Sequence, residues 1–339
     1  MELSSIQQIK TLIDETGRPL QGYLTSIPEQ LDVESFRYFS TMDKQRSSVA
    51  KYFHYKQFQF ISVFTPDYVI GFAIADIRYV GNSFCYLYDI KRNELLEQSW
   101  LRPLGLGYFM TPSPWQGKAV FNGGALTLQI EEGVWSAAVK SKHFSMDITL
   151  TPPSHDSAPI MVSSPTGYSG WTYTQKHNAL NVSGSLNVAG KSVSLSNARA
   201  GYDFSAGFMR RETSWRWASI SADSEGTRLG LNLAAGVNET GVSENALWID
   251  GQRVLLPAVL FEFDRHDPDS AWRIYDSNGL IDLRFSPKNV RKERLNLWLL
   301  KSNFRQFVGT FSGTISLSNG RSYELENVLG LTEDHYAKW

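Results

Sequence analysis

The segment 200–232 holds residues whose types could carry out acid–base chemistry together. Asp203 follows a strand-like run and precedes Gly207 at the start of an irregular segment, and Arg211 leads into the next strand. A carboxyl group buried in a cavity has a raised pKa, because loss of hydration disfavours its charged form, and it can then donate a proton at neutral pH. Arg211 is a natural partner for a carboxylate of the protein or of a ligand. The plainer alternatives are that Asp203 caps a turn or pairs an arginine, and that Arg211 lies in solvent.

Two tryptophans in the same segment form a possible binding wall. Trp215 and Trp217 are separated by one residue in the predicted strand 214–220, so the alternation of a strand places both indoles on one face. Flat aromatic walls are typical of apolar ligand pockets. With Tyr173 they are the predicted lining of such a cavity. The alternative is that both indoles fill a core, since the interior of a barrel serves both purposes.

Other chemistries lack their motifs. We find no glycine-rich phosphate loop, no HExxH and no GxSxG nucleophile elbow. Ser48 and Lys51 match the short Ser-x-x-Lys pattern, but its partner motifs are absent, so a chance match is the better interpretation. The six histidines are scattered, and Cys85 lies in a predicted strand as a buried thiol. We therefore expect no metal site and no cofactor.

Charge and composition exclude several classes of partner. The 339 residues include 33 Lys and Arg against 34 Asp and Glu, a net charge of −1, which argues against binding of nucleic acid or of an anionic membrane. The longest mostly apolar stretch, residues 68–77, is too short to span a bilayer. The N-terminus lacks the basic and apolar regions of a signal peptide, so a cytoplasmic location is expected. The oligomeric state is not indicated.

The elements that must position these residues are almost all strands. Aromatic and β-branched residues alternate with polar ones in runs such as 51–64 and 68–79, and Asn-Gly and Asp-Gly turns separate the later runs. This spacing is typical of antiparallel sandwiches and barrels. Helical periodicity is confined to residues 2–15 and 34–51. The sequence therefore predicts an all-β fold with a few short helices.

The number of strands predicts two domains. Some twenty predicted strands exceed what one small soluble barrel uses, so two stacked barrel-like or sandwich-like domains fit better. We expect an N-terminal arm over 1–45, a first β domain over 46–185 and a second over 186–339.

The tryptophan segment also carries a family resemblance. Asp203-x3-Gly207 followed by Trp215-x-Trp217-Ala218 resembles the family known as domain of unknown function 2804. The other marks of that family follow in order: Lys51-Tyr52-Phe53, Ala75-Asp76-Ile77, Tyr173-Thr-Gln-Lys176, Gly184, Gly190, Gly230-Leu-Asn232, Asn245-Ala-Leu-Trp248, Asp250-Gly251, Phe261-Glu-Phe263, Asp282-Leu-Arg-Phe285, Phe307-x-Gly309-x-Phe311-x-Gly313 and Gly330-Leu-Thr-Glu333-Asp334. The resemblance covers most of the chain beyond about residue 45.

That family is in turn distantly similar to the two-barrel lipocalin-like (calycin) group of carotenoid hydratases and Diels–Alderase-type cyclases. The resemblance implies two lipocalin-like barrels, the second opening near Tyr202 and Asp203, which supports the division near residue 185. The motif of the hydratases is only partly kept. Phe204 stands where they have a histidine, and Ala206 stands where a tryptophan precedes Gly207. Their chemistry therefore does not transfer residue by residue.

Two functions follow from these observations. The first is an enzyme that hydrates, isomerises or cyclises a polyene, isoprenoid or polyketide-like molecule, with Asp203, Glu262 or Glu333 as the acid and Arg211 as partner. Asn232 and Glu262 join the aromatic residues as expected ligand contacts. The second is a non-catalytic carrier or sensor of an apolar ligand, since the fold alone does not fix function. The number of ionisable groups in the cavity distinguishes the enzyme from the carrier, because a carrier needs at most one. An interaction scaffold is a third, less favoured reading, permitted by exposed strand edges.

Overall fold

The computed structural model describes residues 8–236, 241–297 and 300–339. Strands make up 62% of the structure and helices 4%, which confirms the all-β prediction. The single α-helix in the described residues, α1 (Ser48–His54), begins after Ser47, whose hydroxyl accepts a hydrogen bond from the Ala50 amide. Two short 3-10 turns are η1 (Val33–Ser35) and η2 (Asn122–Gly124).

The first sheet is a nearly closed barrel. Its main path runs β5-β4-β3-β2-β14-β12-β10-β9-β8-β7-β6, and β11, β13 and β1 pair beside that path. Its strands are β1 (Gly22–Tyr23), β2 (Lys56–Phe64), β3 (Tyr68–Asp76), β4 (Val80–Asp89), β5 (Glu94–Pro103), β6 (Tyr108–Met110), β7 (Gly117–Phe121), β8 (Leu126–Glu131), β9 (Val134–Lys140), β10 (Phe144–Thr151), β11 (Ile160–Thr166), β12 (Gly170–Val188), β13 (Lys191–Val193) and β14 (Arg199–Gly207).

The second sheet is a half-barrel. Its order is β18-β17-β16-β15-β23-β22-β21-β20-β19, so the C-terminal strand lies at its centre. Its strands are β15 (Glu212–Ser224), β16 (Thr227–Ala235), β17 (Ala246–Ile249), β18 (Gln252–Leu255), β19 (Leu260–Glu262), β20 (Trp272–Tyr275), β21 (Ile281–Leu297), β22 (Leu300–Ser316) and β23 (Ser322–Lys338).

Turn residues with positive φ connect several of these strands directly. Glu225 and Gly226 join β15 to β16 with φ of 50° and 78°, and Asp250 and Gly251 join β17 to β18 with φ of 49° and 89°. Two successive positive φ values are the geometry of the tight hairpin turn whose twist matches that of its strands. The first of these turns sets the register that places Trp217 opposite Ala234 on β16.

Each sheet encloses its own apolar core. Ile61 and Val63 of β2 and Phe204 of β14 point into the first barrel, which we call the barrel core. Leu231 of β16 and Phe311 of β22 belong to the core of the second sheet, the half-barrel core. The alternate residues of the same strands point the other way, because successive side chains of a strand leave on opposite faces.

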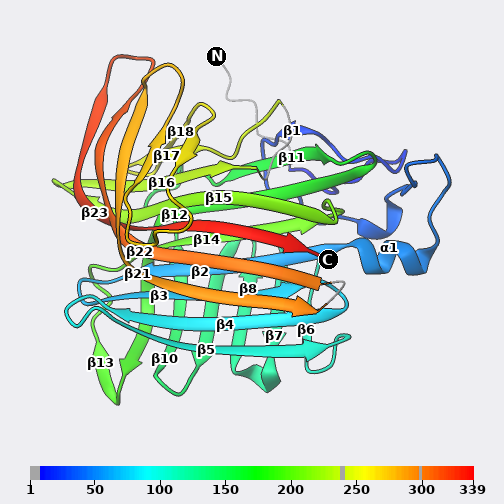
Figure 1. Cartoon of the computed structure of the whole chain (residues 1–339). Coiled ribbons are helices and arrows are strands. Elements are labelled where there is room, and N and C mark those ends of the chain that lie inside the picture. Colours follow the sequence, from blue (N-terminus) through cyan, green and yellow to red (C-terminus); the bar gives the residue numbers. More distant parts are fainter. Residues whose placement is uncertain (1–7, 237–240, 298–299) are drawn as a thin grey trace.

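A third apolar layer joins the two sheets. The interface cluster is formed by outward residues of both sheets: Phe60, Phe64, Val69, Ala73, Phe84, Tyr86, Tyr88, Trp217, Ala234, Phe304, Val308 and Leu331. The Phe60 ring meets the Trp217 indole edge to face at 5.9 Å, and Phe84 packs on Phe304 at 5.8 Å. Figure 1 shows the resulting arrangement, with the orange and red strands β21–β23 lying along the blue and cyan strands β2–β4.

The N-terminal region packs on the first barrel as extended chain. Leu12 and Leu31 are buried in the barrel core, and β1 pairs with β11. The helix expected over residues 2–15 is absent from its described part, residues 8–15, which forms isolated bridges instead. The chain passes from the first sheet to the second between Gly207 and Glu212. The expected division into 46–185 and 186–339 as folding units stays a prediction. No helix in the described residues is long and apolar enough to cross a membrane.

Candidate functional site

A cavity of about 620 Å³ lies between the two sheets, next to the interface cluster. This volume falls in the range of small-molecule sites, roughly 300–1,000 Å³. Outward residues of β2, β3, β4, β12 and β14 form one wall, and residues of β15, β21, β22 and β23 form the other. The cavity is therefore outside both cores, where the two sheets face each other.

Strand register builds the charged part of the first wall. Lys176 on β12 is paired with Asp203 on β14, which in turn is paired with Phe60 on β2. All three therefore point to the same side of the sheet, away from the barrel core. The Lys176 Nζ lies 2.5 Å from Asp203 Oδ2, and Ser205 donates to the other carboxylate oxygen at 2.8 Å.

Glu244 completes this charged group from outside the regular strands. Its carboxylate lies 3.2 Å from Lys176 Nζ, and the side chains of both residues are almost wholly buried. Burial alone would lower the pKa of Lys176, but the carboxylates of Asp203 and Glu244 together outweigh it and hold that pKa above its ordinary value. Burial also raises the pKa of Glu244. Lys176 is thus a fixed cation, 5.8 Å from the centre of the Trp217 ring.

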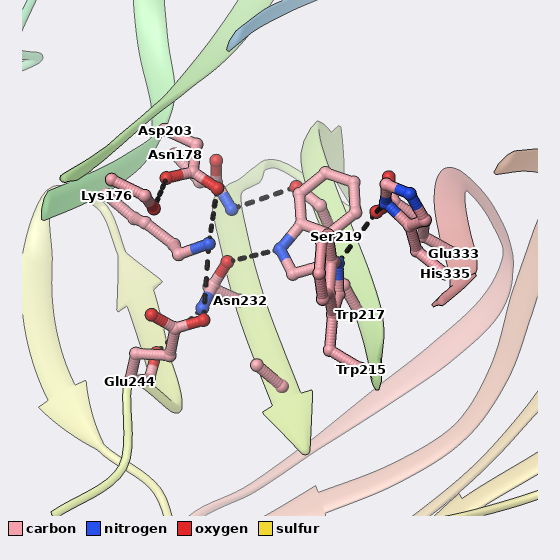
Figure 2. A network of polar contacts seen from close by, with 12 residues as sticks. Lys176, Asn178, Asp203, Trp215, Trp217, Ser219, Asn232, Glu244, Glu333 and His335 are labelled. Carbon is pink, nitrogen blue, oxygen red and sulfur yellow. Dashed lines mark hydrogen bonds and ion pairs between the residues drawn. The ribbon is translucent and has the colours of Figure 1, made fainter. Parts of the chain in front are cut away.

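The second wall places a carboxyl group between two indoles and an imidazole. Glu333 on β23 is opposite Trp217, and His335 is opposite Trp215, so the four side chains face the cavity from two adjacent strands. The Trp215 Nε1 donates to Glu333 Oε1 at 2.8 Å, and Gln306 Nε2 donates to Oε2 at 3.0 Å. Figure 2 shows the Trp215–Glu333 contact beside the chain of bonds around Lys176.

Burial dominates the acidity of Glu333. Loss of hydration raises its pKa to about 7, and the hydrogen bonds from Trp215 and Gln306 oppose this rise only in part. Burial lowers the pKa of the neighbouring His335 to about 3, so that imidazole is neutral at pH 7. A hydrogen bond of 2.9 Å joins its Nε2 to Ser302. Glu333 can therefore hold or release a proton near neutral pH.

Trp217 is held in place by a short polar chain. Its Nε1 donates to Asn232 Oδ1 at 2.7 Å, and Asn232 Nδ2 donates to the backbone oxygen of Glu244 at 2.7 Å. Asn178, at the β-bulge of β12, donates to Ser219 on β15 and so fastens the first sheet to the second (Figure 2). The indole is thereby held through Asn232, while Asn178 fixes the strand that carries it.

Arg291 stands at the other side of the cavity. Its buried guanidinium forms ion pairs with Glu97 and Glu293 and lies 4.0 Å from the centre of the Phe84 ring. Near it the walls carry a group of apolar side chains beside Asn82 and Glu293, and they include the exposed side chain of Leu101. The apolar side chains there are Phe58, Ala75, Ile77, Val80, Leu295 and Leu300.

Four of the residues expected from the sequence meet at this cavity. Asp203, Trp215, Trp217 and Glu333 all line it. Asn232 is buried behind Trp217, to which it is bonded.

The other three lie elsewhere. Tyr173 is buried in the barrel core, where its hydroxyl donates to Gln175. Arg211 and Glu262 are exposed and do not line the cavity.

Several residues of the site were not expected. Alternation along a strand predicts on which face Lys176 and His335 lie once a neighbour on the same face is known. Each of them lies two residues from another polar or cavity residue of its strand. Glu244 lies outside the strands, and no local pattern marks it. No three His, Cys, Asp or Glu side chains come together as a possible metal site anywhere in the described ranges.

Comparisons with known proteins give a family and two partial structural likenesses. Residues 4–339 match the model of the family described as Domain of unknown function (DUF2804). The fold is similar to kievitone hydratase from Nectria haematococca, at 13% identity and a TM-score of 0.48, over 83% of this chain and 88% of that one. It is also similar to a protein from Nitrosomonas europaea with the provisional designation AttH, at 12% identity and a TM-score of 0.40, over 83% and 91% of the two chains. No curated protein sequence matches.

Proposed function

We propose that this chain, which belongs to the family of domain of unknown function 2804, binds a hydrophobic small molecule between its two barrels and transfers a proton to it from Glu333. The observation that carries the proposal is the position of Glu333. Its carboxyl group is buried on the cavity wall with a pKa of about 7, so a large fraction is protonated at neutral pH. An acid of this strength is suited to general acid catalysis at that pH.

The surroundings of Glu333 suit a reaction that creates positive charge. Protonation of a carbon–carbon double bond leaves a cation on the neighbouring carbon, and the faces of Trp215 and Trp217 attract such a charge. The carboxylates of Asp203 and Glu244 add negative potential nearby, although Lys176 offsets part of it. We therefore assign Glu333 as the acid and the two indoles as the groups that stabilise the cation.

Three outcomes follow from one cation. Capture by water is hydration, loss of a different proton to the Glu333 carboxylate is isomerisation, and attack by a second double bond is cyclisation. Polyene, isoprenoid and polyketide-like molecules carry the double bonds that these reactions need. The apolar side chains near Arg291 suit the rest of such a chain.

A non-catalytic carrier is the alternative, and the charges of the cavity weigh against it. A carrier needs at most one ionisable group to anchor a polar head. Here Lys176, Asp203, Glu244, Glu333 and Arg291 all line the cavity. Burying so many charges costs free energy of folding, and a carrier would gain nothing from that cost. Their presence therefore favours catalysis.

The test begins with native mass spectrometry of the purified protein and extraction of any bound molecule. The extract is then incubated with protein in D2O, where protonation by an acid exchanged with solvent places deuterium on carbon. We expect incorporation that is lost in Glu333→Gln, while binding of the neutral fluorophore N-phenyl-1-naphthylamine is kept. Glu262→Gln is the matched control, because that carboxylate is exposed and outside the cavity. Equal incorporation by Glu333→Gln and the unmodified protein would remove Glu333 as the acid.

A further inference from the structure

Lys56 is a second buried lysine on the cavity, and no reaction step above uses it. It stands at the start of β2 with 4% of its surface exposed, and its side chain lines the cavity. Its Nζ donates to the backbone oxygen of Phe53 in the last turn of α1. The same nitrogen lies 5.2 Å from the centre of the Tyr79 ring.

The two buried lysines of the cavity differ in their partners. Lys176 is held between two carboxylates. Lys56 has no carboxylate within ion-pair distance among the residues that the structure describes. The acid that acts on it, Asp76, is engaged by Arg78 at 3.1 Å and by the hydroxyl of Tyr108. A buried lysine without a countercharge is costly as a cation, so it favours the neutral amine.

The charges around Lys56 act in opposite directions, so burial decides the outcome. Burial is the main cause that lowers its pKa, to about 7, while Asp76 raises it and Arg78 lowers it. His54, on α1, is the other titratable group that interacts with this ammonium, and burial keeps the pKa of that imidazole below its usual value. Asp76 alone in this set favours the charged form of Lys56, and it does not outweigh burial. Desolvation next to another cation is one of the ways in which proteins activate lysine as a nucleophile.

We propose that Lys56 captures the carbonyl carbon of an apolar aldehyde or ketone as an imine. The inference rests on the proposed use of this cavity as a ligand site, and it names the substrate class. The geometry that carries it is a buried amine that lines the cavity, has no ion-pair partner among the described residues and donates to a backbone oxygen alone.

The step balances without a cofactor. The lone pair of the Lys56 nitrogen forms a bond to the carbonyl carbon, and the carbon–oxygen double bond opens. The oxygen takes the two protons of the amine and leaves as water, and a carbon–nitrogen double bond remains. Protonation of that nitrogen by solvent gives the iminium ion.

The separation between Lys56 and the acid limits the shape of this ligand. Phe60, which touches Trp217, is four residues further along β2, or about 13 Å at the rise of a strand. Glu333 lies across from Trp217 in the second sheet. A molecule that reaches both Lys56 and Glu333 is therefore long and extended. A conjugated chain with a terminal carbonyl group meets both conditions.

Reductive trapping tests the proposal directly. The full-length protein is incubated with decanal and sodium cyanoborohydride at pH 7, and the modified peptide is located by mass spectrometry. At pH 7 an amine of pKa about 7 is half unprotonated, about a thousandfold more than a surface lysine. We expect Lys56 to be alkylated at least about tenfold faster than the exposed lysines, since its lower basicity and restricted access take back part of that advantage.

Controls separate this proposal from the function on which it rests. Lys56→Arg should lose the adduct, whereas Lys301→Arg, at an exposed position on the same cavity, should keep it. Peptide mapping of the unmodified protein gives the answer even if Lys56→Arg fails to fold. Labelling spread over exposed lysines would overturn the proposal. So would displacement of N-phenyl-1-naphthylamine by decanal without any adduct, an outcome that leaves the cavity as a ligand site. Salt-dependent binding of decanoate without trapping of decanal would make Lys56 an anion anchor instead.

Discussion

The indole Nε1 of Trp215 donates a hydrogen bond of 2.8 Å to Glu333 Oε1 from the neighbouring strand. A tryptophan can only donate, so this contact fixes which way the carboxyl group turns whether or not it is ionised. The second oxygen accepts from Gln306. The orientation of the acid is therefore set by the sheet itself, before any ligand enters.

The first prediction concerns the pH dependence of stability at Glu333. Its pKa is about 7 in the folded protein against 4.5 for the free side chain, so folding favours the protonated form. The stability that this gives is complete below about pH 4.5 and is lost as the pH rises through 7. Replacement by the uncharged Gln removes the loss. We therefore compare the free energy of unfolding of Glu333→Gln with that of the unmodified protein at each pH. This difference should shift in favour of the variant by about 3 kcal/mol between pH 4 and pH 8.

Urea unfolding at pH 4, 6 and 8 measures this difference. Glu262→Gln serves as control and should follow the unmodified protein at each pH, because its carboxylate is exposed. Parallel curves for Glu333→Gln and the unmodified protein would show that Glu333 keeps an ordinary pKa.

The second prediction concerns the countercharge at Lys176. Lys176→Met leaves Asp203 and Glu244 buried without their cation, and removing one partner of a buried ion pair costs about 3–5 kcal/mol. Without the cation the buried carboxylate of Glu244 loses the group that lowers its pKa, so that pKa rises further in the folded variant. Its loss of stability should therefore be largest near pH 8 and smaller near pH 4.

Guanidinium unfolding at the two pH values measures this change. The control is Arg273→Met, which breaks an ion pair with Asp282 in which both side chains are more than half exposed. Solvent screens such pairs, and we expect little change at either pH. A loss for Lys176→Met that is the same at pH 4 and pH 8 would show that the cation does not govern these carboxylates.

The third prediction concerns the bond between Trp217 and Asn232. Trp217→Phe keeps an aromatic ring against Phe60 but leaves the buried amide oxygen of Asn232 without its donor. An unsatisfied buried acceptor costs about 1–3 kcal/mol. Binding of N-phenyl-1-naphthylamine, followed by fluorescence, should also weaken because the ring that lines the cavity is smaller.

A double-mutant cycle with Asn232→Leu isolates the bond from the change of shape. The two substitutions should be less harmful together than the sum of their separate effects, by about 1 kcal/mol. Strict additivity would mean that the bond contributes nothing to stability.

Alternation along strands explains what could be predicted from the sequence. Trp215 and Trp217 were expected on one face, and the structure places both on the cavity. The same rule does not say which face of a strand meets a ligand when both faces are buried. Strand β12 shows this, because its residues from Trp171 to Leu180 are all buried. Tyr173 belongs to the barrel core and Lys176 to the cavity. Which of the two faces meets the cavity is decided by where the second sheet stacks on the first.

Contacts between distant segments account for most of what was missed. Glu244 reaches Lys176 across 68 positions of the chain from a segment with no strand pattern. Glu262 was expected at the site, but its strand, β19, forms the far edge of the second sheet. The order of strands in a sheet decides such distances, and local composition does not encode that order.

The alternation of the wall strands has a consequence for how this chain can vary. On β2, Ile61 and Val63 belong to the barrel core, while Phe58 and Phe60 face the cavity. Point substitutions at the second set can reshape the cavity and leave the first set untouched. Insertion or deletion of a single residue within β2 exchanges the two sets, because the side-chain period is two. The shape of the cavity can therefore change by substitution, whereas the lengths of these strands cannot change without rebuilding the core.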